Sequence, residues 1–296
     1  MSETRTIVDR DGREHRFPPP LERAHRVVEG RVVTRSLEAH VVDHCNLRCA
    51  ECCSLSPLLP PRFESPEALA RDLARAAAVL APAVFKLVGG EPLLHPELLE
   101  LVHVARRSGI APRVSLTTNG LLLHRMPDAL WQQLDGLTIS RYPRPRIPAA
   151  RVAEIEAKGA RFGVRINWKQ QDAFVQMSRP HGPADPAETA AVYGRCWLRE
   201  RCHLLRDGHF HTCTRPVHLA TLHHADPRPD GLALEGCTPE GVLAYLRRET
   251  PLAACAHCAG GDAPMVPHRL LSPQDLRRDR RPRAPGGGAG SPREPA

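Results

Sequence analysis

Aromatic side chains are scarce in this chain, at 4% of its 296 residues. Proteins that bind single-stranded nucleic acid stack the bases on aromatic rings, so the formal charge of +8 does not by itself indicate such a partner. Several of the arginines behind this charge lie in the C-terminal stretch from Arg277 to Arg293. We therefore do not expect nucleic acid to be a partner.

Long apolar runs are also missing. Residues 73–90 form the longest candidate, but Arg75, Pro82 and Lys86 interrupt it, and a membrane-spanning helix needs about 20 apolar residues. The first 14 residues are charged throughout and lack the apolar core of a signal peptide. We therefore expect a cytoplasmic protein without a membrane partner. Because that compartment is reducing, the ten cysteines are not expected to form disulfides, and their clustering indicates metal binding instead.

Expected strands and helices alternate between residues 37 and 178. A short apolar run ends at Val42, and Ser65-Pro66 begins a helix that we expect to reach about Leu80. Further strands are expected at 83–88, 113–118, 136–140 and 161–167, and further helices at 97–108, 127–134 and 148–158. This alternation predicts an α/β fold, a partial (β/α)6 TIM-type barrel in which ligands collect at the carboxyl ends of the strands.

Four segments are expected along the chain. Residues 1–36 are interpreted as an N-terminal arm or edge hairpin, 37–178 as the barrel, 179–269 as a small cysteine-rich α+β domain, and 270–296 as a disordered tail rich in Arg, Pro and Gly. Within the third segment we expect a hairpin around Asp207-Gly208 and a helix from Thr238 to about Arg248.

Three cysteines follow the first expected strand in a CxxxCxxC pattern: Cys45, Cys49 and Cys52. Thiolates suit soft metals and iron–sulfur clusters. Three thiolates are one ligand short of a closed site, so one metal position stays open to a cofactor or substrate. The alternative is a structural zinc site completed by His44 or Cys53, although structural zinc usually uses two separated pairs of ligands.

The segment HCNLRCAEC, from His44 to Cys52, resembles the cluster-binding loop of the radical S-adenosylmethionine (SAM) superfamily. The resemblance implies that the three cysteines hold a 4Fe–4S cluster whose open iron binds SAM through its amino and carboxylate groups. An electron from the cluster would then cleave SAM to methionine and a 5′-deoxyadenosyl radical, which abstracts hydrogen from a substrate. Glu51 departs from the family pattern, which often has an aromatic residue there, near the adenine.

Further motifs lie where the following strands are expected to end. The pair Gly89-Gly90 lets backbone approach a ligand, Glu91 adds a carboxylate, and their order after the cysteine loop matches the family segment that binds the SAM amino group. The next two strand ends carry a Thr-Asn-Gly turn and a Ser-Arg pair, for which simple turn and solvent-facing roles are the alternatives. The resemblance implies these candidates for cofactor binding: Gly89, Gly90, Glu91, Pro92, Thr118, Asn119, Ser140 and Arg141.

Substrate contacts are less defined. Asn167 and Lys169 end a further expected strand and are candidates to meet substrate. The sequence identifies no catalytic residue.

A second cysteine set follows the expected barrel. A hairpin that carries cysteines, a capped helix and a CxxC pair resemble the shortened auxiliary-cluster domain called twitch, which is related to the SPASM domain. The resemblance implies that a second 4Fe–4S cluster binds to Cys196, Cys213, Cys255 and Cys258. Cys202 competes with Cys196 as a ligand, and a structural zinc site with four cysteines is the alternative.

Four remaining side chains are given no role in metal binding. Cys53 and Cys237 are expected to be ordinary buried thiols, and His209 and His211 to be exposed to solvent.

The resemblance covers about residues 37–260 and implies a radical SAM enzyme that receives electrons from a reductant such as flavodoxin or ferredoxin. A small polar metabolite is the expected substrate, changed by oxidation, epimerisation or decarboxylation in natural-product tailoring. Residues 1–36 are expected to be too short for the leader-binding domain of many peptide-modifying relatives. A peptide (RiPP) maturase is the first alternative, and a non-enzymatic zinc- or cluster-binding regulatory module is the alternative of another class.

Overall fold

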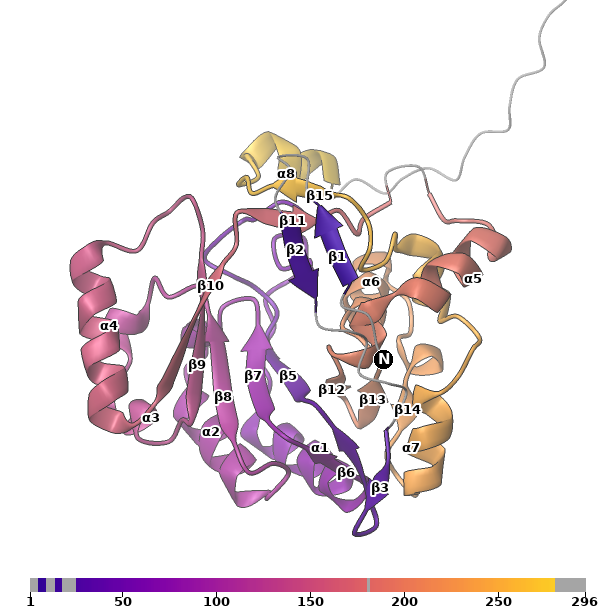
Figure 1. Cartoon of the computed structure of the whole chain (residues 1–296), viewed down its shortest axis with the longest axis horizontal. Coiled ribbons are helices and arrows are strands. Elements are labelled where there is room, and N and C mark those ends of the chain that lie inside the picture. Colours follow the sequence, from indigo (N-terminus) through magenta and orange to yellow (C-terminus); the bar gives the residue numbers. More distant parts are fainter. Residues whose placement is uncertain (1–4, 9–13, 18–24, 180–181, 280–296) are drawn as a thin grey trace, which may run out of the picture.

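A single large sheet organises the chain in the computed structural model, which describes residues 5–8, 14–17, 25–179 and 182–279. Five parallel strands lie side by side in the order β10-β9-β8-β7-β5, and Figure 1 shows them from left to right. Their bounds are β5 Leu37–Val42, β7 Phe85–Gly89, β8 Val114–Thr118, β9 Gly136–Arg141 and β10 Arg165–Gln170. The bounds of each of these strands lie within four residues of those predicted.

The hairpin around Asp207-Gly208 extends the same sheet. Its first strand, β12 (Leu204–Arg206), pairs parallel with β5, and its second, β13 (His209–His211), pairs antiparallel with β12. The short strand β14 (Leu232–Ala233) follows at the edge. The sheet thus contains six parallel strands, and the expected boundary near residue 178 does not separate the hairpin from the barrel.

Helices cover one face of this sheet and bury its apolar side chains. They are α1 Pro66–Val79, α2 Leu98–Arg107, α3 Asp128–Trp131 and α4 Ala149–Phe162. The predicted start of α1 is confirmed, since the Ser65 hydroxyl accepts a hydrogen bond from the Ala68 amide at 3.1 Å. Helix α4 runs four residues beyond its predicted end, because Gly163 (φ +70°) supplies the left-handed cap, and β10 therefore begins only at Arg165.

The opposite face of the sheet is mostly polar. Strand residues alternate in direction, so Leu37 and Phe85 join the apolar core while their neighbours Glu38 and Lys86 point the other way. Glu38 lies opposite Lys86, which in turn lies opposite Ser115. By the same alternation this face carries Glu38, Lys86, Ser115, Thr117, Thr138, Ser140, Asn167 and Lys169.

The remaining elements surround this framework. Strand β11 (Ala173–Val175) pairs antiparallel with β15 (Met265–Pro267), and both lie above the sheet in Figure 1. Helices α5 (Pro186–Arg195), α6 (Arg215–His223) and α7 (Pro239–Leu246) lie on the right of that view. The 3₁₀ turns are Pro92–Leu94, Leu123–Arg125, Trp197–Glu200, Arg228–Asp230 and Ala253–His257.

The N-terminal segment contributes two antiparallel strand pairs, which belong to two small sheets separate from the large one. Strand β1 (Arg5–Val8) pairs with β2 (Glu14–Phe17), and β3 (Val27–Val28) pairs with β4 (Arg31–Thr34). Strand β4 also pairs parallel with β6 (Leu80–Pro82), which anchors this end of the chain to the barrel.

The prediction of a disordered tail from residue 270 is wrong for residues 270–279. Helix α8 spans Pro273–Asp279, and Leu271 just before it is buried. Its start is capped reciprocally, because the Asp275 amide donates to the Ser272 hydroxyl (3.1 Å) and the Ser272 amide donates to the Asp275 carboxylate (2.8 Å). Residues 280–296, the rest of the expected tail, lie outside the described residues.

None of the helices in the described part of the chain has the length and apolar character needed to cross a membrane.

Candidate functional site

The cysteine loop begins at a buried ion pair. Asp43, two residues before Cys45, receives hydrogen bonds from both terminal nitrogens of Arg206 at 3.0 and 2.7 Å. Arg206 also donates to the carbonyl of His40 at 3.1 Å, and both members of the pair are less than 5% exposed. The hairpin β12–β13 therefore fixes the position at which β5 ends and the cysteine loop begins.

The two glycines after β7 let that strand end lie directly against the cysteine loop. The Gly90 amide donates to the Val42 carbonyl at 2.7 Å, and the Glu91 amide donates to the His44 carbonyl at 3.1 Å. A Cβ atom at Gly90 would overlap the carbonyl of His44, and one at Gly89 (φ +137°) would overlap the carbonyl of Val42. Side-chain-free residues are therefore required at both positions.

The three thiols of the loop lie close to one another. Burial raises the pKa of Cys45 to about 11 and the pKa values of Cys49 and Cys52 to about 12, and the neighbouring thiols add to the rise at Cys49. The Leu47 amide donates to the Cys45 sulfur at 3.3 Å. The metal-free loop therefore holds neutral thiols, and a metal or cluster has to displace their protons on binding.

Glu91 joins three of the predicted motifs. Its carboxylate is fully buried and accepts hydrogen bonds from the Thr118 hydroxyl (2.7 Å), the Asn119 amide (2.8 Å) and the Leu93 amide (3.0 Å). Burial raises the pKa of Glu91, and these three bonds oppose the rise. The Asn119 side chain donates to the side-chain oxygen of Asn46 in the cysteine loop at 2.6 Å. The structure thus places residues 89–92, Thr118 and Asn119 beside the thiols of the cysteine loop.

The Ser-Arg pair at the end of β9 divides between the two faces of the sheet. Ser140 is buried on the polar face. Arg141 is exposed and follows the alternation of the apolar face, with its guanidinium 5.4 Å from the centre of the Trp168 ring. The structure therefore does not bring Arg141 to the thiols. Asn167 and Lys169 lie on the polar face of β10.

The sequence assigned no role to an aromatic group that lies beside the first thiols. Tyr142 lies near Cys45, Cys49 and Cys52, and burial raises the pKa of its hydroxyl. Its ring stacks on His268 with centroids 4.9 Å apart, and Phe174 lies 5.6 Å from His268. His268 Nε2 is 3.2 Å from the sulfur of Cys49. No local pattern marks His268, because it meets the loop only through a contact across 219 residues of sequence.

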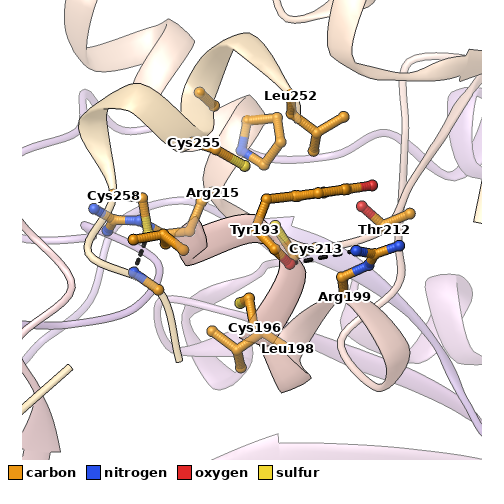
Figure 2. A pocket seen from close by; sticks show the side chains of 14 residues that line it. Tyr193, Cys196, Leu198, Arg199, Thr212, Cys213, Arg215, Leu252, Cys255 and Cys258 are labelled. Atoms are coloured by element: carbon orange, nitrogen blue, oxygen red, sulfur yellow. Dashed lines mark hydrogen bonds between the residues drawn. The ribbon is translucent and has the colours of Figure 1, made fainter. Parts of the chain in front are cut away.

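The second cysteine set gathers in one apolar pocket, and Figure 2 shows its four thiols: Cys196, Cys213, Cys255 and Cys258. Cys196 caps the C-terminal end of helix α5, Cys213 follows β13, and the other two lie at the 3₁₀ turn Ala253–His257. The Gly261 amide donates to Cys196 and the Gly260 amide to Cys258, each at 3.4 Å. Cys202 is not in this pocket and lies half-buried near Glu38 and Lys86.

Arg215 brings a buried positive charge to the same pocket. It is the first residue of α6, is 3% exposed, and its Nε and one terminal nitrogen have no hydrogen-bond partner. Leu198 and Leu252 contribute apolar surface to the pocket wall, and the Thr212 hydroxyl there is also unpaired. An unpaired buried charge is costly, so this pocket suits a group of negative charge. Four thiolates around a metal or cluster constitute such a group.

The four thiols do not meet at a single point. Within the residues that the structure describes, no three Cys, His, Asp or Glu side chains converge as ligands of one metal ion do, and this holds for the thiols of the first loop as well. A tetrahedral zinc site with Zn–S bonds of about 2.3 Å brings its sulfurs within about 3.8 Å of one another. A four-iron cluster is larger and holds its thiolates further apart.

Two expectations about isolated residues are wrong. Cys53 is exposed rather than buried, and Cys237 is only half-buried. His211 is 1% exposed, because the last strand of the hairpin is covered by the chain around Gly231, while His209 is half-buried.

Comparison with known proteins agrees with this geometry. Residues 40–142 match the model of the Radical SAM superfamily. GTP 3′,8-cyclase of Chlorobaculum tepidum is 38% identical over 104 residues, which cover 34% of this chain and 30% of that protein. GTP 3′,8-cyclase of Streptomyces coelicolor is 36% identical over 114 residues, covering 37% and 33%. The chain therefore spans about a third of the length of these relatives.

Among solved structures, BtrN in complex with AdoMet and 2-DOIA aligns with a TM-score of 0.46 and 13% identity, over 73% of this chain and 82% of that chain. Similarity of this degree carries no argument about function. The family match covers the cysteine loop, the glycine pair, Glu91 and Asn119. Residues 40–142 are therefore a radical SAM superfamily domain.

Proposed function

We propose that the protein is a radical SAM enzyme that binds a 4Fe–4S cluster through Cys45, Cys49 and Cys52 and cleaves SAM reductively. The observation that supports this most is the meeting of three thiols on one loop with a buried carboxylate motif from the next strand. When bound and reduced, the cluster supplies the electron that splits SAM into methionine and a 5′-deoxyadenosyl radical.

The residues around the loop orient the ligands. Three donors already occupy the Glu91 carboxylate, which leaves at most one of its lone-pair positions for a ligand. We therefore propose that Glu91 holds Asn119 and the neighbouring strand ends in position. The partly exposed backbone of Gly89 and Gly90 is then the surface that the SAM amino group meets, and Ser140 faces the same side. Arg141 is left out of this assignment because it lies against Trp168.

The substrate is proposed to be a small polar molecule. The face of the sheet opposite the helices is mostly polar, and its Glu38–Lys86 ion pair (3.0 Å) is partly accessible, with 30% of the Lys86 side chain exposed. Charged and hydroxyl groups at that face match a hydroxylated or ionic metabolite better than an apolar one. A nucleotide belongs to this class, and the relatives named above are called GTP 3′,8-cyclase. A peptide substrate is the alternative.

A second 4Fe–4S cluster is proposed for the pocket of Cys196, Cys213, Cys255 and Cys258. Its support is the four thiols around one apolar pocket, the two backbone amides that donate to their sulfurs, and the unpaired charge of Arg215. A cluster with four protein ligands has no open iron, so this site would accept or pass on electrons. A structural zinc site, or a regulatory module without catalysis, is the alternative.

Product analysis under anaerobic conditions tests the proposal. Protein reconstituted with iron and sulfide, then mixed with SAM and dithionite, is expected to release 5′-deoxyadenosine. The triple change Cys45→Ala, Cys49→Ala and Cys52→Ala is expected to abolish this release, whereas Cys237→Ala, at a thiol outside both sites, leaves it unchanged.

The second site gives the contrasting result. Changing Cys255 and Cys258 to Ala is expected to remove iron while part of the 5′-deoxyadenosine release remains. Equal loss in both sets of variants would contradict the division of labour between the sites. A protein that stays colourless and retains zinc would support the non-enzymatic alternative.

A further inference from the structure

A segment far outside the radical SAM domain is paired with the cysteine loop. The Ala50 amide donates to the Arg269 carbonyl at 2.9 Å, and the Leu271 amide donates to the Arg48 carbonyl at 2.7 Å. These two bonds lie on either side of Cys49, which forms an isolated antiparallel bridge with Leu270. The backbone of residues 269–271 therefore fixes the middle cysteine of the loop.

The residue before this pairing points its ring at the same cysteine. The His268 amide donates to the Asp172 carbonyl at 2.7 Å, and its ring stacks on Tyr142. With backbone and ring held in this way, Nε2 lies 3.2 Å from the sulfur of Cys49. A metal-bound thiolate only accepts hydrogen bonds, so in the loaded protein this contact requires the proton on Nε2.

Hydrogen bonds to cluster sulfurs have a defined effect. They stabilise the more negative, reduced form of the cluster and therefore raise its reduction potential. They also fix the orientation of the ligand that accepts them.

We propose that His268 is a positioning residue of the SAM-binding cluster: it donates a hydrogen bond to the Cys49 thiolate, orients that ligand and makes the cluster easier to reduce. This inference rests on the proposed function. It also assigns the segment 268–271, which follows the second cysteine set, to the active site of the barrel.

A redox titration followed by EPR tests this role. His268→Phe keeps an aromatic ring against Tyr142 and removes the donor, whereas His268→Gln keeps an N–H donor. In a background where Cys255 and Cys258 are Ala, only the first cluster contributes to the signal. The Phe variant is expected to load iron normally and to be at least tenfold harder to reduce, which is about 59 mV for one electron. The Gln variant is expected to recover part of this change.

The matched control is His124→Phe, because His124 is exposed and its ring contacts the Leu121 carbonyl at 3.0 Å. It is expected to leave the potential unchanged. A loaded His268→Phe protein with the wild-type potential would overturn the proposal. If the loop holds no cluster in the protein in which only Cys255 and Cys258 are changed, this result would instead count against the proposed function.

Wild-type protein provides a test that does not depend on a stable variant. With ¹⁵N-labelled histidine, pulsed EPR of the reduced first cluster is expected to show coupling to an imidazole nitrogen. Absence of this coupling in the wild type, with the cluster loaded, would refute the hydrogen bond.

Discussion

Gly90→Ala isolates the contact between the end of β7 and the cysteine loop. The new methyl group would overlap the carbonyl of His44, one residue before Cys45. Because this neighbour is backbone, no side-chain rotation can relieve the overlap, and the loop itself has to move. Movement weakens the bonds from the Gly90 amide to Val42 and from the Glu91 amide to His44.

The size of the effect follows from those two bonds. Each contributes about 0.5–1.5 kcal/mol, so their loss lowers the free energy of unfolding by about 1–3 kcal/mol. That is a large part of a total stability of about 5–15 kcal/mol. Since Cys45 adjoins the displaced carbonyl, the variant is also expected to bind less iron at the first site.

Gly194→Ala is the matched control. Gly194 lies in helix α5, and a Cβ atom there meets no other atom within 4 Å. Alanine at this position, one residue before the end of the helix, is expected to raise the free energy of unfolding by at most about 0.5–1 kcal/mol. Urea unfolding of the metal-free proteins and iron analysis after reconstitution measure both effects. The reasoning is refuted if Gly90→Ala retains wild-type stability and a full first cluster.

Three further predictions concern buried charges and protons. Glu91→Gln sets an amide group against the Asn119 N–H and leaves a buried donor unpaired, so urea unfolding should show a loss of about 1–3 kcal/mol, and unchanged stability would contradict the network. Arg215→Met removes an unpaired buried charge, so urea unfolding should show the metal-free protein to be more stable by at least about 1 kcal/mol. The second cluster should become harder to reduce. Destabilisation of the metal-free protein would argue against this reasoning. Burial lowers the pKa values of His40 and His203 to about 3. Between this value and the unfolded pKa near 6.5, the unfolded chain binds more protons than the folded protein. The free energy of unfolding should therefore fall as the pH drops through this window. Equal unfolding free energies at about pH 7 and pH 5 would refute this last prediction.

Local signals were sufficient to predict the framework of the fold. Ser65 and Thr238 both cap helices as their sequence context predicts, with hydrogen bonds of 3.1 and 3.2 Å to amides three residues on. The strand positions follow from short apolar runs, and the spacing of Cys45, Cys49 and Cys52 places three thiols on one loop. The sequence alone does not decide between Cys196 and Cys202, because only the fold shows which of the two lines the pocket.

Contacts between distant segments could not be read from the sequence. His268 reaches Cys49 through a crossing of two irregular segments, and no periodicity marks such a crossing. The helix that begins after Ser272 carries a Ser-x-x-Asp cap, but the surrounding Arg and Pro residues favoured disorder. The face of the sheet on which Arg141 lies follows from the alternation of side chains along β9, and this alternation depends on the residue at which β9 begins.

EPR of the reduced protein with and without SAM tests the central claim most directly, using the variant in which Cys255 and Cys258 are Ala. If the loop of Cys45, Cys49 and Cys52 leaves one iron open to SAM, a single 4Fe–4S signal remains, and its shape changes when SAM is added. A variant with no such signal, or with a signal that SAM leaves unchanged, would contradict the assignment.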